Sequence, residues 1–158
     1  VAEQVKETVN FAVPEENGMS YADRVETDWA FRIQLPIGTN VPFHCTASGK
    51  CFLSSLNKRE RNGILSSLKL EALTEKTHVT IEALMQELNQ IKKQGYALDR
   101  EEFMEGMIAI AVPIKDKEDR FIGALAFHGP TQRISIENAI ARKEILLNAS
   151  QKLREHLF

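Results

Sequence analysis

The chain has 158 residues and a formal net charge of −2 at pH 7. This length is enough for one domain with a buried core. Because there is no basic surplus, the chain alone is a poor candidate for binding nucleic acid. It contains neither an apolar run of about 18 residues nor a charged-then-apolar leader, so we predict no membrane helix and expect a cytoplasmic protein.

The first quarter of the chain favours short antiparallel strands. Residues 8–14 alternate with period two, which predicts a strand, and the Asn-Gly pair that ends residues 15–18 predicts a tight hairpin turn. A second strand is expected over residues 19–26 and a third over 29–34. Two prolines and a glycine predict a loop over 35–42.

Three helices follow, each opened by a capping residue. Thr46 is a suitable N-cap for a helix over 47–56, and Asn57 caps a second, short helix. Thr80 caps a third helix, which ends at Gly95. The buried stripe expected for this third helix consists of Ile81, Leu84, Leu88 and Ile91.

Two apolar runs, residues 107–114 and 121–128, are joined by the charged segment 115–120 and predict a β-hairpin. Side chains alternate between faces along a strand. One face should carry the large residues Ile108, Ile110, Val112, Ile114, Phe121, Leu125 and Phe127. The other should carry Met107, Ala109, Ala111, Ala124, Ala126 and His128. A face covered by alanine leaves space above it, which either a helix or a small ligand fills.

The remaining segments define the fold class. Residues 96–99 predict a short strand and residues 100–106 an acidic loop. Ser135 is expected to cap one long terminal helix whose buried stripe comprises Ile136, Ile140, Leu146 or Leu147, Leu153 and Leu157. Strands joined by short turns predict an α+β domain, with an antiparallel sheet and helices packed on its faces.

Several motifs occur in a fixed order along this chain. They are LPIG (35–38), HCTASGKCFL (44–53), GYALD (95–99), IAVPI (110–114), Gly129-Pro130 and Arg133-Ile134-Ser135. Together these motifs resemble the effector-binding domain of IclR-type bacterial transcriptional regulators. The resemblance covers nearly the whole chain, from about Thr8 to the end.

This resemblance implies a GAF-like antiparallel sheet with helices packed on its faces, and makes residues 1–158 a single effector-binding domain. It implies a small-molecule effector and a homodimer or homotetramer; no cofactor and no membrane contact are expected. The helix start at Ala47, with His128 as a second partner, favours a carboxylate as this effector. The chain begins with Val1 rather than Met, so we expect an excised domain or a processed fragment. DNA would be bound only through an N-terminal winged helix-turn-helix that this chain lacks.

Ala47 and Ser48 are the first candidate ligand-binding residues. The first N–H groups of a helix have no partner within the helix, and they favour anions. Small side chains there allow a ligand to approach, and the resemblance places ligand contacts at these two positions. The alternative is an ordinary capped helix packed against the sheet.

The resemblance also implies that Asp99 accepts a hydrogen bond from the ligand, although Asp is often a solvated turn residue. Ala109, Ala126 and His128 match positions that carry a thiol and two hydroxyls in some family members. The alanines favour a less polar acid, and the imidazole can donate, accept or carry charge. His128 could instead bond only to the backbone.

Two apolar residues, Ile33 and Val41, fall near the apolar wall of the pocket that the resemblance implies. Plain core packing is the alternative for each of them. His44 is interpreted as a structural residue that anchors the loop before its helix. The four histidines are scattered without metal-ligand spacing, so no metal site is predicted.

Two other functions remain open from the sequence. A thiol-dependent redox enzyme would use Cys45 or Cys51, but a catalytic thiol needs a base within hydrogen-bond reach, and a buried cysteine is more often a small apolar residue. Our first interpretation is therefore that the chain is not an enzyme. An assembly domain without a ligand is the third possibility.

Overall fold

An antiparallel sheet forms the centre of the computed structural model, which describes residues 4, 7–25 and 37–157. Within these residues the strand order is β3-β2-β1-β6-β5-β4. The strands are β1 (Thr8–Glu15), β2 (Gly18–Val25), β3 (Asn40–Val41), β4 (Ala97–Arg100), β5 (Met107–Lys115) and β6 (Phe121–Pro130). The helices with described bounds are α2 (Ala47–Ser55), α3 (Lys58–Ser67), α4 (Ile81–Gln94), α5 (Ile136–Ala141) and α6 (Lys143–Leu157).

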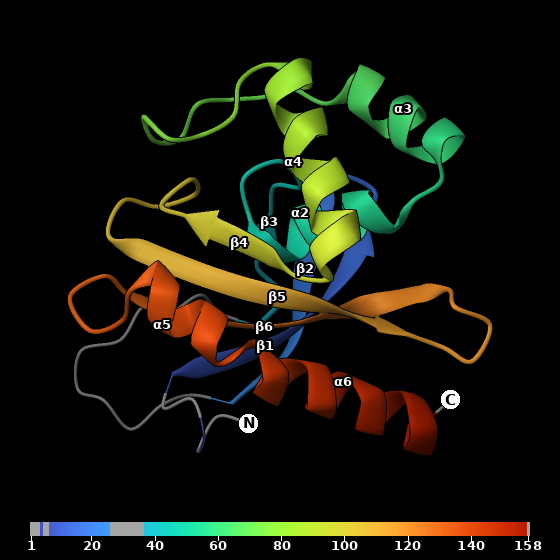
Figure 1. Cartoon of the computed structure of the whole chain (residues 1–158). Helices are drawn as coiled ribbons and strands as arrows, with labels where there is room; N and C mark the ends of the chain where they lie inside the picture. The colour runs from blue at the N-terminus through green and yellow to red at the C-terminus, as the bar shows by residue number, and fades with distance from the viewer. Residues whose placement is uncertain (1–3, 5–6, 26–36, 158) are drawn as a thin grey trace.

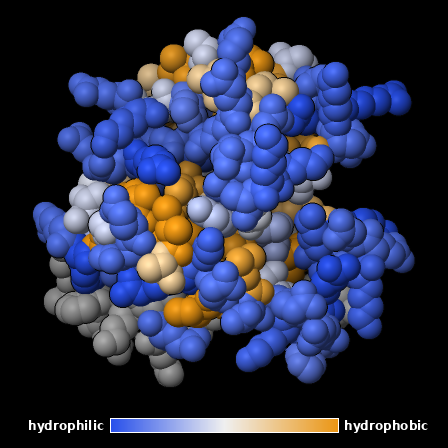
Figure 2. All heavy atoms as spheres, in the orientation of Figure 1, coloured by the Kyte–Doolittle hydropathy of each residue, from blue (hydrophilic) through white to orange (hydrophobic). Residues whose placement is uncertain are grey.

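Helices cover both faces of the sheet (Figure 1). Helices α2, α3 and α4 lie on one side, and α5 and α6 lie on the other. Hydrophilic side chains cover most of the face drawn in Figure 2, and hydrophobic ones show where the sheet passes between the two helix layers. This arrangement confirms the predicted α+β class. No helix in the described part of the chain is both long and apolar enough to cross a membrane.

The first predicted hairpin is confirmed. Strands β1 and β2 meet at Gly18, where an added Cβ would lie 2.4 Å from the carbonyl oxygen of Val41. The expected third strand over 29–34 lies outside the described residues. The predicted loop over 35–42 instead contains β3, which pairs with Met19 and Ser20. A two-residue strand is too short to leave a periodic signal.

The two faces of the β5–β6 hairpin separate as predicted, with one exception. The isoleucines of β5 pack in the α5–α6 side of the core, and the alanines of both strands pack beneath α2. The prediction that Phe121 lies on the same face as Leu125 and Phe127 is wrong. The register shifts next to Lys115, which pairs with Phe121, and this turns Phe121 to the alanine side, 5.3 Å from the ring of Phe52.

The predicted helix caps are confirmed. Thr46, Asn57 and Thr80 each accept a hydrogen bond from the backbone N–H three residues later. Gly95 ends α4 with a φ of 86°. Ile81 is 39% exposed and does not belong to the buried stripe, because the packed surface begins only a turn further on, at Leu84.

The long terminal helix is two helices. Arg142, with φ −99° and ψ 7°, leaves helical geometry between α5 and α6. Its N–H bonds to the carbonyl oxygens of Ala139 and Ile140. Among the stripe residues whose burial the structure describes, Leu146 alone is fully buried, whereas Ile136, Ile140 and Leu153 are half-buried. The apolar spacing continues through the break, so it gave no sign of the interruption.

Gly49 allows α2 to begin close to the chain that precedes it. An added Cβ would lie 2.5 Å from the backbone of Phe43, so we expect Gly49→Ala to lower the free energy of unfolding by about 1–3 kcal/mol. Gly63 in α3 has nothing within 4 Å, and Gly63→Ala should raise stability by about 0.5–1 kcal/mol. Urea unfolding measures both; equal effects of the two substitutions would contradict this account.

Candidate functional site

A small cavity lies between the start of α2 and the alanine face of the sheet. Its volume is about 20 Å³, enough for about one water molecule. Six predicted ligand-binding residues border it: Ala47, Ser48, Asp99, Ala109, Ala126 and His128. The other lining residues are Asn10, Tyr21, Thr46, Phe103 and Met107. Ile33 lies outside the described residues, and Val41 is buried in the core without bordering the cavity.

The α2 start is the positive side of this cavity. Thr46 has extended backbone geometry, and its hydroxyl oxygen accepts the N–H of Gly49 at 3.0 Å while donating to the carbonyl of Pro42. The N–H groups of Ala47 and Ser48 belong to the first turn, where a helix offers no internal acceptor. The helix dipole adds positive potential at this end. An anionic group is therefore favoured there.

Asp99 is fully enclosed, with only 1% of its surface exposed. The alternative interpretation of Asp99 as a solvated turn residue is therefore wrong. Its carboxylate accepts the backbone N–H of Glu102 at 2.8 Å and that of Phe103. Burial nevertheless raises the pKa of Asp99 to about 7. The group can thus be a proton donor or an acceptor near neutral pH.

An ion pair that the sequence analysis missed lies directly behind Asp99. Lys50 of α2 is fully buried, and its Nζ lies 2.8 Å from both carboxylate oxygens of Glu102 and 2.8 Å from Oε1 of Glu87. Glu102 also accepts the backbone N–H of Arg100 at 3.0 Å. The available signal was a single lysine in the otherwise small and apolar segment 47–53.

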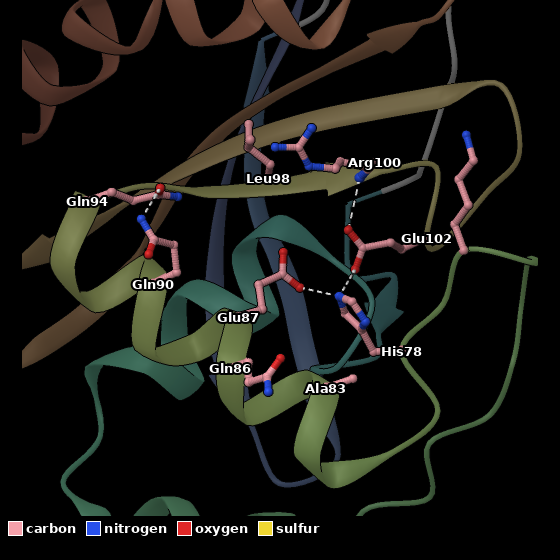
Figure 3. Close-up of a pocket in the computed structure, with 10 residues that line it drawn as sticks. His78, Ala83, Gln86, Glu87, Gln90, Gln94, Leu98, Arg100 and Glu102 are labelled. Atoms are coloured by element: carbon pink, nitrogen blue, oxygen red, sulfur yellow. Dashed lines mark hydrogen bonds and ion pairs between the residues drawn. The ribbon is translucent and has the colours of Figure 1, made fainter.

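A larger groove opens on the outer side of this ion pair, between α4 and the edge strand β4 (Figure 3). Its volume is about 630 Å³. His78 and Glu87 point toward one another there, and His78 Nε2 lies 3.9 Å from Glu102 Oε1. These three side chains are grouped closely enough to hold a metal ion. The ammonium of Lys50 already contacts both carboxylates, so we assign no metal to them.

The remaining candidate residues, His44 and the two cysteines, are buried in the packed interior. His44 is buried and its Nε2 pairs with the carbonyl of Glu71 at 2.9 Å, which confirms its anchoring role. Cys45 and Cys51 are free and buried. Burial raises the pKa of each thiol to about 12, so neither is a thiolate at neutral pH. This disfavours the thiol-dependent enzyme, because the thiolate is the nucleophile.

Comparison with known proteins identifies the family. Residues 1–155 match the model of the bacterial transcriptional regulator IclR C-terminal domain. The chain is 36% identical over 137 residues to the probable transcriptional regulator SauR of Cupriavidus necator, covering 87% of this chain and 54% of that protein. It is 32% identical over 148 residues to the regulator KdgR of Escherichia coli, covering 94% of this chain and 56% of that protein. The chain belongs to the IclR C-terminal family.

Solved structures agree with this assignment. The C-terminal domain of Escherichia coli KdgR superimposes with a TM-score of 0.87 at 30% identity, covering 98% of this chain and 89% of that one. The inducer-binding domain of PobR from Acinetobacter, a double mutant in complex with 3-hydroxybenzoic acid, gives 0.89 at 26% identity, covering 97% and 90%. The chain spans only about half the length of the curated relatives it matches.

Loss of the buried ammonium should destabilise the fold strongly. Lys50→Met leaves the Glu102 carboxylate buried without its partner, and we expect a loss of about 3–5 kcal/mol in the free energy of unfolding. Lys76→Met, which removes an exposed ion pair with Glu101, should leave the urea midpoint unchanged. Similar small losses for both variants would show that the buried pair is not needed.

Asp99 should give stability a specific pH dependence. The folded protein holds its proton up to about pH 7, whereas an unfolded chain releases it at about pH 4. Stability therefore falls as pH rises between these values, and Asp99→Asn should remove that fall.

Asp116 is the matched control for this pH dependence. Hydrogen bonds from Arg120 hold the pKa of Asp116 below its usual range. Asp116→Asn should therefore remove stability that is present at neutral pH and lost in acid. Urea unfolding over a pH series measures all three proteins. Parallel curves for the wild type and Asp99→Asn would contradict the shifted pKa.

Proposed function

We propose that this domain binds a small carboxylate effector in the cavity at the start of α2, and that the effector controls DNA binding by a further domain of the full-length protein. The observation that carries the proposal is a set of buried polar groups around one enclosed space. Asp99, His128 and Asn10 are all buried there. Of these groups, Oδ1 of Asn10 has no hydrogen-bond partner among the described residues. A buried polar atom without a partner is costly, and a polar ligand would supply one.

The lining gives each part of such a ligand a place. One carboxylate oxygen would accept the N–H groups of Ala47 and Ser48, where the helix dipole favours negative charge. Protonated Asp99 would donate to the other oxygen. Ala109 and Ala126 would contact the hydrocarbon part. The relative PobR supports a carboxylic acid, since its inducer-binding domain holds 3-hydroxybenzoic acid.

The cavity must enlarge to accept any organic acid. Phe103, in the loop after β4, is half-buried, and Met107 is unbranched and adaptable. Movement of these two side chains would open space without disturbing the sheet. An effector that binds the open arrangement better shifts the equilibrium toward it. That unequal affinity is what a regulatory ligand requires.

Assembly and DNA contact are the remaining parts of the proposal. Relatives considerably longer than this chain are named transcriptional regulators, so we propose that a DNA-binding domain accompanies this one in a cytoplasmic regulator. We propose a homodimer or homotetramer, because paired half-sites on DNA are read by dimers. A change in the arrangement of the effector domains would then alter the spacing of the DNA-binding domains.

A thermal-shift screen of small carboxylic acids tests the proposal. A bound acid at about 100 times its Kd should raise the melting temperature of the wild type by about 5–10 °C. Ala126→Val places two methyl groups in the cavity and should abolish the rise while the unliganded protein still melts cooperatively. Lys76→Met, which alters an exposed residue that does not line the cavity, serves as the control and should respond like the wild type. No response to any acid, or an undiminished response of Ala126→Val, would contradict the proposed site.

A further inference from the structure

Asn10 brings an unsatisfied polar atom to the cavity. It lies on β1 opposite Ala126 of β6, lines the cavity and is only 2% exposed. Its Nδ2 lies 2.9 Å from Nδ1 of His128. Its Oδ1 is buried and has no hydrogen-bond partner in the described part of the structure.

A buried amide oxygen without a partner is costly, and such atoms are rare in folded proteins. On β1, the neighbouring residue on the same face toward the turn is Ala12, which is fully buried in the core and carries no polar side-chain atom. Asn10 itself lines the cavity, so a ligand there can reach its Oδ1. Asn10 is held in place by the sheet and by His128, so its direction is fixed before a ligand arrives.

We propose that the effector carries a hydroxyl group close to its carboxylate, and that Asn10 selects for this hydroxyl. The inference rests on the proposed function, because it assumes a carboxylate at the α2 start. The hydroxyl donates its hydrogen to Oδ1 of Asn10 while the carboxylate meets the N–H groups of Ala47 and Ser48. A hydroxyl both donates and accepts, so it matches either atom of the amide that faces it.

The alanine face explains why Asn10 has this role. Ala109 and Ala126 offer no side-chain hydrogen-bond group to a ligand, so on this face of the sheet the hydroxyl of an effector is met by a neighbouring strand. Asn10 pairs with Ala126 across β1 and β6 and lies on the same face of the sheet. A deoxy acid would leave Oδ1 unsatisfied in the complex, which should weaken its binding about tenfold relative to the hydroxy acid.

Calorimetric titration of the wild-type chain with three matched pairs tests this inference. The pairs are lactate with propionate, 3-hydroxybutyrate with butyrate, and 3-hydroxybenzoate with benzoate. We expect at least one hydroxy acid to bind about tenfold tighter than its deoxy partner. Equal affinities within every pair that binds would overturn the role of the hydroxyl and leave the proposed carboxylate site standing. Binding by no acid of any pair would overturn both.

Variants then assign the selectivity to Asn10. Asn10→Leu has a similar shape without polar atoms, and should bring the two affinities of a pair within about twofold. Thr8→Val alters a buried residue of the same strand that does not line the cavity, and should retain the full preference. If Asn10→Leu does not fold, Asn10→Val, which also lacks a hydrogen-bonding side-chain atom, provides the same comparison. Retained preference in the folded Asn10 variant would overturn the assignment.

Discussion

The buried contact between Lys50 and Glu102 is the interaction on which the cavity depends. Two charges taken out of water are costly unless their geometry is good and their other hydrogen-bonding positions are filled. Both conditions are met here, because Lys50 reaches two carboxylates and Glu102 also accepts a backbone N–H. The pair joins α2 to the loop that follows β4. It thereby fixes both walls of the cavity relative to each other.

The same pair connects the cavity to the outer surface. The backbone N–H of Glu102 donates to Asp99, and its side chain holds Lys50, which in turn holds Glu87 of α4. A ligand that changed the position or protonation of Asp99 would act on Glu102 and, through Lys50, on α4. A chain of contacts thus runs from the small interior cavity to a helix on the surface (Figure 1).

Local chemistry made much of the fold predictable, but the long-range contacts could not be predicted. The Asn-Gly turn, the capping residues and the strand alternation act within a few residues, so each was visible in the sequence. The shift that turns Phe121 and the break at Arg142 arise from packing, which spacing does not record. The GYALD motif marked Asp99 as a candidate residue, but the sequence did not show that Asp99 is buried. Asn10, Lys50 and Glu102 were missed because each acquires its role from a residue distant in sequence.

The central claim is that a small carboxylate meets the first turn of α2. The most direct test is a titration of the isotopically labelled chain with 3-hydroxybenzoate and lactate, followed through its backbone amide resonances. The account predicts that the largest changes fall on Ala47, Ser48 and the residues around Asp99. Saturable changes confined to the groove beside His78, or no saturable changes at all, would contradict it.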